Sequence, residues 1–432
     1  MSLYNSAALL IALVAVVGYL NHRVLRLPAT IGMVLIALVA SLLLLGLDLI
    51  FPDLRLGPQV QALIKSIDFN QTLMYGMLSF LLFAGALHME LDQLLDRRWV
   101  ILTLATVGVV LATTLVGLAT WLVLKVLGLG LPLLVCLVFG ALISPTDPIA
   151  VLGILKSANA PREVEAIIAG ESLFNDGVGV VVFLALTGIA GLKAGTGGGG
   201  GGAPDAGQVA LLFGREVGGG IALGLGLGWI AYQGLKSINE YKIEVQITLA
   251  LVMLITLLAG VLHISGPIAV VLAGLLLGNH GRQFAMSPMT IEHVETFWEL
   301  IDEILNAVLF LLIGLEVFAI SLQPAHLAAG AVMIPFVLLA RFLAVGLPVQ
   351  VLSRLRRPLP RGTVPVLAWS GLRGGISVAL VLSLPPFEGR DTILTVTYVV
   401  VLFSILGQGL TVRRVVTRLL GAAPKPSKHG VV

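Results

Sequence analysis

Long apolar stretches separated by short polar gaps dominate this chain of 432 residues. A transmembrane helix needs about 20 consecutive apolar residues to cross a bilayer core about 30 Å thick. The pattern predicts thirteen such helices, near residues 3–21, 29–50, 72–89, 99–121, 131–155, 164–190, 209–235, 244–262, 264–279, 299–320, 326–353, 362–384 and 391–411. Gly266 and Pro267 leave the ninth short, and a re-entrant segment would give the same pattern. The predicted fold class is an all-α polytopic membrane protein.

Composition supports this interpretation and excludes several others. Hydrophobic residues make up 58% of the chain and charged residues 11%, with a mean hydropathy of +1.04, which indicates a protein embedded in lipid. The net charge of +3 does not indicate nucleic-acid binding, because the basic residues lie in gaps between apolar runs. Cys136 is the only cysteine, which excludes an intrachain disulfide. The first apolar run, from Leu3, lacks a preceding basic region and is interpreted as a membrane anchor rather than a signal peptide.

The distribution of lysine and arginine predicts the orientation, because cytoplasmic loops carry the excess of these residues. With the N-terminus outside, eighteen fall on the cytoplasmic side: Arg23, Arg26, Arg97, Arg98, Lys156, Arg162, Lys236, Lys242, Arg282, Arg354, Arg356, Arg357, Arg361, Arg413, Arg414, Arg418, Lys425 and Lys428. Six fall outside: Arg55, Lys65, Lys125, Lys193, Arg215 and Arg390. We therefore expect a multi-pass cell (inner) membrane protein with its C-terminus in the cytoplasm.

A glycine run from Gly197 to Gly202 divides the chain and is predicted to be a flexible external linker. The fifth and twelfth spans are each interrupted by Pro or Gly at a similar place, which is typical of an inverted repeat with two discontinuous crossing helices. The predicted divisions are a first half at 1–195, the linker at 196–207, a linking helix within 208–243, a second half at 244–418 and a short cytoplasmic tail at 419–432.

Strongly polar side chains inside predicted spans indicate where the function lies, because each costs about 2.5 kcal/mol or more in hydrocarbon. At a rise of 1.5 Å per residue, Asp147, Asp176, Arg341 and Arg373 lie roughly 12, 18, 18 and 17 Å from the cytoplasmic ends of their helices, near the middle of the bilayer. One site could hold all four.

In the fifth span, Pro145 and Pro148 lack amide hydrogens, so the carbonyls of Ala141 and Ser144 lose their helical partners. Freed oxygens of this kind suit a hard cation, and Thr146 and Asp147 add further oxygens. A kinked helix whose polar side chains satisfy its own backbone is the alternative. The carboxylate of Asp147 favours the cation site.

In the sixth span, Glu171 and Asn175 are four residues apart, as are Ser172 and Asp176, which places all four on adjoining stripes of one helix face. The carboxylates could instead pair with arginines to hold the bundle together. Three intramembrane carboxylates, counting Asp147, face two arginines, so one carboxylate has no permanent partner. That one can take a cation or a proton.

These motifs resemble the NhaP/NHE family of sodium/proton exchangers. The resemblance rests on Thr146–Asp147–Pro148, on Gly170–Gly177 (GESLFNDG), on Leu339–Phe342 (LARF) and on Gly371–Gly374 (GLRG), and it covers nearly the whole chain. It implies a secondary transporter rather than an enzyme, with no cofactor, a homodimer in the lipid bilayer, and exchange of Na⁺ or Li⁺ for H⁺ in pH homeostasis.

The resemblance also implies a role for each residue. Asp176 is the proton-carrying and cation-binding aspartate, and Asp147, the Thr146 carbonyl and Ser172 complete the Na⁺ ligands. Asn175 belongs to the Asn-Asp arrangement associated with electroneutral 1:1 exchange. By the same resemblance Glu171 pairs with Arg341, and Arg373 neutralises the dipole ends of the broken twelfth helix.

One position departs from the family pattern. Related prokaryotic sequences often carry an acidic residue after Leu82-Phe83, where this chain has Ala84.

Other functions are less consistent with the sequence. A channel would need a continuous polar lining, whereas the polar residues here cluster at one depth. An intramembrane hydrolase is disfavoured because Ser172 has no histidine in its cluster. K⁺/H⁺ exchange remains an open alternative to Na⁺/H⁺ exchange.

Overall fold

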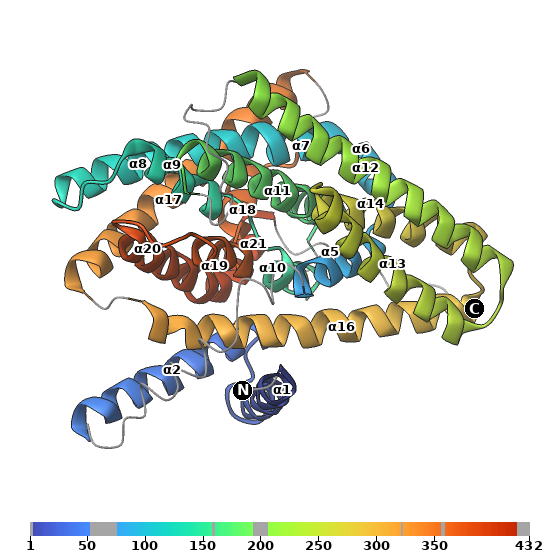
Figure 1. The fold of residues 1–432 in the computed structure, drawn as a ribbon, viewed down its shortest axis with the longest axis horizontal. Helices are drawn as coiled ribbons and strands as arrows, with labels where there is room; N and C mark the ends of the chain where they lie inside the picture. The colour runs from blue at the N-terminus through green and yellow to red at the C-terminus, as the bar shows by residue number, and fades with distance from the viewer. Residues whose placement is uncertain are drawn as a thin grey trace.

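The computed structural model describes residues 3–51, 76–157, 160–192, 206–320, 323–355 and 359–420, and these ranges are almost entirely helical (Figure 1). Before the glycine run the chain forms α1 (Leu3–Leu20), α2 (Ala29–Ile50), α5 (Leu78–Leu87), α6 (Leu91–Asp96), α7 (Arg98–Thr103), α8 (Val109–Val126), α9 (Leu133–Ile143), α10 (Ile149–Ser157) and α11 (Arg162–Ile189). After it the chain forms α12 (Ala206–Ser237), α13 (Tyr241–Leu262), α14 (Gly266–Leu276), α15 (Arg282–Phe284), α16 (Pro288–Leu315), α17 (Pro324–Leu355), α18 (Thr363–Ser370), α19 (Gly375–Leu382), α20 (Arg390–Leu402) and α21 (Gly409–Leu420).

The predicted all-helical membrane class is confirmed. Among the described residues, seven helices are long and apolar enough to cross a membrane, by length and composition: α1, α2, α7 continued by α8, α11, α13, α17, and α20 continued by α21. The other six predicted spans overlap helices that are shorter, interrupted or richer in charged residues. The count of thirteen crossings stays a prediction, as does the full crossing of the ninth, where α14 is followed by the π-helical turn η5 (Leu277–Gly281).

The tenth helix differs most from its predicted bounds of 299–320. α16 begins eleven residues earlier, at Pro288, and ends at Leu315. Its first three turns carry several charged residues, so a hydropathy threshold places the start too late. Ser287 caps this end, since its side chain accepts a hydrogen bond from the amide of Thr290, and Pro288 occupies the first helical position.

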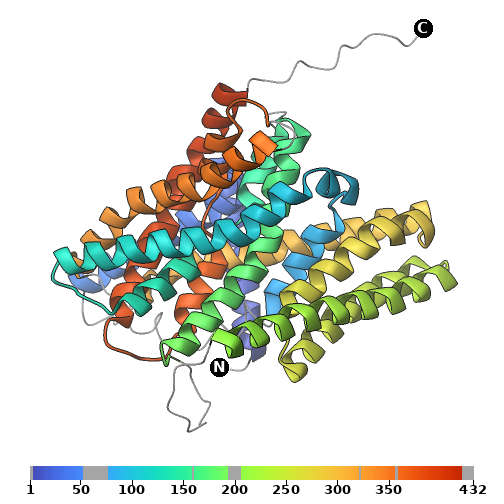
Figure 2. The same ribbon diagram turned by 90° about the horizontal axis from the view of Figure 1, so that it is seen from above.

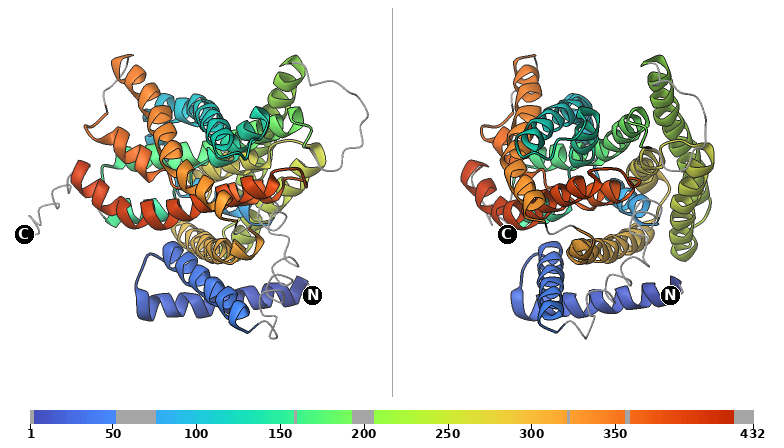
Figure 3. Two further views of the ribbon diagram at one scale, coloured as in Figure 1. Left: turned by 90° about the vertical axis from the view of Figure 1, so that its left-hand side faces the viewer. Right: turned by 60° about the vertical axis from the view of Figure 1, so that its left-hand side comes forward.

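α16 connects two regions of the bundle. It lies between the α1–α2 pair and the remaining helices (Figures 1 and 3), and it packs against α2, α5 and α13. Val308 to Phe318 belong to a hydrophobic cluster formed mainly with α2, α9, α17, α19 and α20, whereas Val294 and Trp298 belong to a second one with α5, α11, α13 and α14. α12, α13 and α14 pack side by side at the edge of the second cluster (Figure 2).

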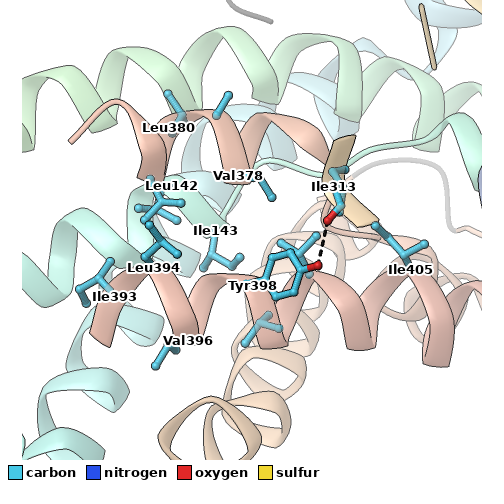
Figure 4. Close-up of a cluster of buried hydrophobic side chains, with 14 of the residues drawn as sticks. Leu142, Ile143, Ile313, Val378, Leu380, Ile393, Leu394, Val396, Tyr398 and Ile405 are labelled. Atoms are coloured by element: carbon cyan, nitrogen blue, oxygen red, sulfur yellow. Dashed lines mark hydrogen bonds between the residues drawn. The ribbon is translucent and has the colours of Figure 1, made fainter. Parts of the chain in front are cut away.

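Buried backbone groups at the end of α16 find partners within the first cluster. Ile313 lies in the last turn of α16, where carbonyls have no intrahelical donor. The hydroxyl of Tyr398, on α20, donates to this carbonyl at 2.9 Å, surrounded by Ile143, Val378 and Leu394 (Figure 4). In hydrocarbon an unsatisfied carbonyl costs several kcal/mol, so this hydrogen bond helps anchor α20 to α16.

Two helices are interrupted where the sequence predicts breaks. α9 ends at Ile143 and α10 begins at Ile149, while α18 ends at Ser370 and α19 begins at Gly375. The two extended segments lie against each other, and the amide of Asp147 donates to the carbonyl of Leu372 at 2.8 Å. Helix ends carrying partial charges of both signs therefore meet at one place.

Two predicted boundaries remain to be compared with the structure: the glycine linker and the end of the last helix. The Gly197–Gly202 linker lies outside the described residues. The last helix is longer than the predicted 391–411, because α20, the π-helical turn η7 (Phe403–Gln408) and α21 run continuously to Leu420. α21 carries arginines on its exposed side and buries Val412 and Val416, so it is amphipathic and falls below a hydropathy threshold.

Candidate cation-binding site

A cavity of about 600 Å³ lies between α5, α11, α16 and the two helix breaks. Thr146, Asp147, Ser172 and Asp176, the four residues that the family resemblance assigns to Na⁺, all line this cavity. They come from the break between α9 and α10 and from the middle of α11. The break supplies extended backbone and the helix supplies a rigid row of side chains.

Asp147 lies at the contact between the two breaks. Its amide is held by Leu372, and its carboxylate faces Gly374 so closely that a Cβ atom on this glycine would overlap the carboxylate. A glycine at position 374 therefore lets the second break approach Asp147. The position of this carboxylate depends on both interrupted helices at once.

A buried hydroxyl and amide cluster joins the first break to α11. The hydroxyls of Thr146 and Ser172 lie 3.0 Å apart, and the Asn175 side-chain amide donates to the Thr146 hydroxyl at 2.8 Å. The Thr146 amide donates in turn to the Asn175 Oδ1 at 3.4 Å. Asn175 thus orients Thr146, while Ser172 reaches the cavity.

Asp176 lies one turn beyond Ser172 and is 7% exposed. Gly179, on the next turn of α11, packs so tightly against Pro145 that a Cβ atom there would overlap the proline ring. This contact fixes α11 beside the break and brings Asp176 to the same cavity as Asp147. Two carboxylates in one buried cavity can share a cation or a proton.

Glu171 belongs to a different part of the structure. Both of its carboxylate oxygens accept hydrogen bonds from Arg341 on α17, at 2.5 and 2.9 Å, and both residues are buried. Arg341 also donates to the carbonyl of Leu367 at 3.3 Å. Glu171 does not line the cavity, so it lies off the face that Ser172 and Asp176 present.

Arg373 neutralises a helix end, but in the fifth span rather than the twelfth. Its guanidinium donates to the carbonyls of Ser144 and Pro145, at the C-terminal end of α9. The Ala141 carbonyl accepts from the Ser144 amide at 3.3 Å. The prediction that the Ala141 and Ser144 carbonyls are free for a cation is therefore wrong, because an arginine from the neighbouring break reaches the second of them.

Sequence reasoning missed four polar residues that line the cavity: Glu295, Glu299 and Asp302 of α16 and Ser377 of α19. Ala84 also lines the cavity, with only a methyl group. The Ser287-Pro288 pair is a helix-start signal that would have extended the tenth helix back over Glu295, whereas Glu299 and Asp302 lie inside the predicted span and were not recognised as site residues.

Interrupted helices that meet beside carboxylates in a cavity are typical of membrane transporters of small cations. Over residues 9–418 the chain matches the family described as "Sodium/hydrogen exchanger, transmembrane", and it belongs to this family.

Related antiporters match this chain over nearly its full length. The chain is 48% identical to the Na⁺/H⁺ antiporter NhaP of Pseudomonas aeruginosa, covering 98% of each chain. It is 35% identical to the Na⁺/H⁺ antiporter NhaH of Halobacillus dabanensis, covering 92% of this chain and 93% of that one. Its fold resembles the sodium proton antiporter MjNhaP1 of Methanocaldococcus jannaschii, with a TM-score of 0.75 and 21% identity over 98% of this chain and all of that one.

Proposed function

We propose that the protein is a secondary antiporter that exchanges Na⁺ for H⁺ across the cell membrane, with both ions competing for Asp176. The observation that carries this proposal is that Asp176 and Asp147 line one buried cavity between two helix breaks. Cation sites beside discontinuous helices, built from unwound backbone and carboxylates, are the arrangement used by alternating-access transporters. The relatives named as Na⁺/H⁺ antiporters support sodium as the cation.

Asp176 and Asp147 supply the charge that binds Na⁺, and the Ser172 hydroxyl and Thr146 carbonyl supply neutral oxygens. The Thr146 side chain is engaged by Asn175, so this residue contributes through its backbone. Protonation of Asp176 removes one negative charge and releases the cation. The same carboxylate therefore carries a proton in one direction and a sodium ion in the other.

Coupling follows from the cost of burying charge. An empty site with Asp176 ionised leaves an unpaired carboxylate in a low-dielectric interior, which opposes movement of the site across the membrane. Loading with either ion removes that cost. Because Asn175 is neutral and Glu171 is paired with Arg341, one exchangeable charge accounts for the cycle and gives one proton per Na⁺.

Transport into proteoliposomes tests this function. We expect an imposed Na⁺ or Li⁺ gradient to drive proton movement, and larger proton movement with K⁺ than with Na⁺ would favour K⁺/H⁺ exchange. No cation-dependent proton flux with any of the three would overturn the antiporter assignment. A reversal point that shifts with an imposed voltage would exclude the 1:1 stoichiometry.

The proposal includes an orientation and an assembly. The excess of Lys and Arg in the predicted inner loops supports an external N-terminus and a cytoplasmic C-terminus. The matching interruptions of the fifth and twelfth spans support an inverted repeat. A homodimer in the bilayer follows from the family resemblance, and cross-linking in native membranes measures it. A monomer in that assay would contradict this part of the proposal.

A further inference from the structure

The cavity is lined by a buried hydroxyl with an unused hydrogen-bonding group. Ser377, in the first turn of α19, is 1% exposed and lines the cavity. Within the described residues its Oγ has no hydrogen-bond partner. A buried hydroxyl without a partner loses the hydrogen bonds that it would make in water. Such a group in a native structure requires an explanation, and an ion or water in the cavity is one.

Asp302 lines the same cavity from α16. Asn306, one turn further along on the same face, is buried and places a neutral amide next to the Asp302 carboxylate. α16 approaches the start of α19 through Leu309, which packs against Gly375 so closely that a Cβ atom on this glycine would overlap the leucine. Asp302 and Ser377 therefore line one cavity from two helices that pack against each other.

α16 carries several acidic residues on the face that lines the cavity. Glu295, Glu299 and Asp302 follow at intervals of four and three residues, which places them on one helix face, and all three line the cavity. Glu295 is paired with Arg282, and Arg162 of α11 also lines the cavity. On α16, Glu299 and Asp302 therefore add negative charge to the cavity, to which Glu90 and Glu165 also contribute.

We propose that Asp302 and Ser377 form an outer subsite that binds a partly hydrated monovalent cation before it reaches Asp176 and Asp147. The inference rests on the proposed exchange function. One carboxylate and one hydroxyl provide hard oxygen ligands without enclosing the ion, so the cation keeps part of its water. Ala84 adds no oxygen to this cavity, and the additional carboxylate comes from α16.

The test compares Asp302→Asn, Ser377→Ala and the double variant with the wild type in proteoliposomes. Glu303→Gln is the matched control, because Glu303 is the adjacent residue, has the same charge, is exposed and does not line the cavity. We expect the apparent KM for Na⁺ to rise about tenfold in Asp302→Asn and about threefold in Ser377→Ala, with a double variant below the product of the two because the groups share one ion. Glu303→Gln should leave KM unchanged.

Raising the ionic strength distinguishes direct contact between Asp302 and the cation from long-range electrostatic attraction. Adding choline chloride to about 0.5 M screens exposed charges. A contact subsite keeps the KM ratio of Asp302→Asn to wild type, whereas a ratio that falls to one would overturn the subsite. Ser377→Ala keeps the test decisive if Asp302→Asn does not fold, since it removes a hydroxyl that has no protein partner.

The failure of this inference differs from failure of the proposed function. Unchanged KM in Asp302→Asn and Ser377→Ala, with an active wild type and an inactive Asp176→Asn, would overturn the outer subsite alone. A wild type without cation-dependent proton flux would overturn both.

Discussion

Glu171 and Asp176 are buried carboxylates five residues apart on the same helix, yet their surroundings differ. Glu171 receives two hydrogen bonds from Arg341 and lies away from the cavity, whereas Asp176 lines the cavity with Asp147. Five residues rotate a side chain by about 140° around the helix axis, so the two face different neighbours. One carboxylate is held by an arginine, and the other faces the cavity, where we propose that it binds an exchangeable ion.

The comparison shows why a charge count alone is incomplete. Three carboxylates opposed by two arginines leave one negative charge, but the count does not say which residues pair. Arg373 donates to backbone carbonyls at the end of α9, so its charge serves a helix end. The contacts show that Arg341 pairs with Glu171, which the count alone does not determine.

The largest effect is expected from Asp176→Asn, which removes the carboxylate that binds both ions. Exchange should fall to the level of empty liposomes, because the amide can neither ionise nor carry a proton. Asp176→Glu should retain a small activity, since it keeps the charge but shifts the oxygens by one methylene. Proton flux driven by a Na⁺ gradient measures both variants. Robust exchange by Asp176→Asn would contradict the site assignment.

Glu171→Gln should lower the stability of the folded protein, in contrast to Asp176→Asn, which should abolish exchange. It leaves the buried Arg341 without its partner, at a cost of about 3–5 kcal/mol, and Glu171→Gln combined with Arg341→Gln should be milder. Glu163→Gln is the control, because Glu163 pairs with Arg97 at 2.8 Å while half exposed, and such surface pairs contribute about 0–1 kcal/mol. Thermal unfolding in detergent measures all three variants. A double variant that loses the sum of the single losses would show that the pair does not interact.

Replacing two glycines of the second break by alanine should have different effects, one on cation binding at Asp147 and the other on the stability that the Glu171–Arg341 pair provides. A Cβ atom at Gly374 would overlap Asp147, so Gly374→Ala should raise the apparent KM for Na⁺. A Cβ atom at Gly371 would overlap the Arg341 guanidinium, so Gly371→Ala should mainly lower stability, by about 1–3 kcal/mol. Gly260→Ala is the control, because that helical glycine has open space around it. Equal effects of Gly371→Ala and Gly374→Ala on KM would remove this distinction.

The smallest expected effect is a change of the apparent KM with pH, which is measured on the wild-type protein. Because proton and cation compete for Asp176, the apparent KM for Na⁺ should rise as pH falls, by up to about tenfold per pH unit below the pKa of the site. The rate at saturating Na⁺ should change less. Initial rates over a series of Na⁺ concentrations at each pH measure both quantities. A KM that stays constant or falls on acidification would exclude competition at one carboxylate.

The sequence alone determined the membrane class, the bounds of α2, the positions of both helix breaks and four polar residues that line the cavity, Thr146, Asp147, Ser172 and Asp176. These follow from local properties, since apolar length selects a membrane helix and proline or glycine interrupts one. The proximity of Ser172 and Asp176 also follows from the sequence, because four-residue spacing places side chains on neighbouring turns of one helix face.

Only the tertiary structure decided which groups contact one another across the bundle. Arg373 reaches the end of α9 because the two breaks lie against each other, although they are more than two hundred residues apart in the chain. The carboxylates of α16 line the cavity because this helix packs against α5 and α19. A hydropathy pattern records how apolar each position is, and it does not record which neighbour a polar side chain finds. The pairing of Glu171 and the exposure of Asp176 to the cavity therefore depend on how α11, α17 and the breaks pack.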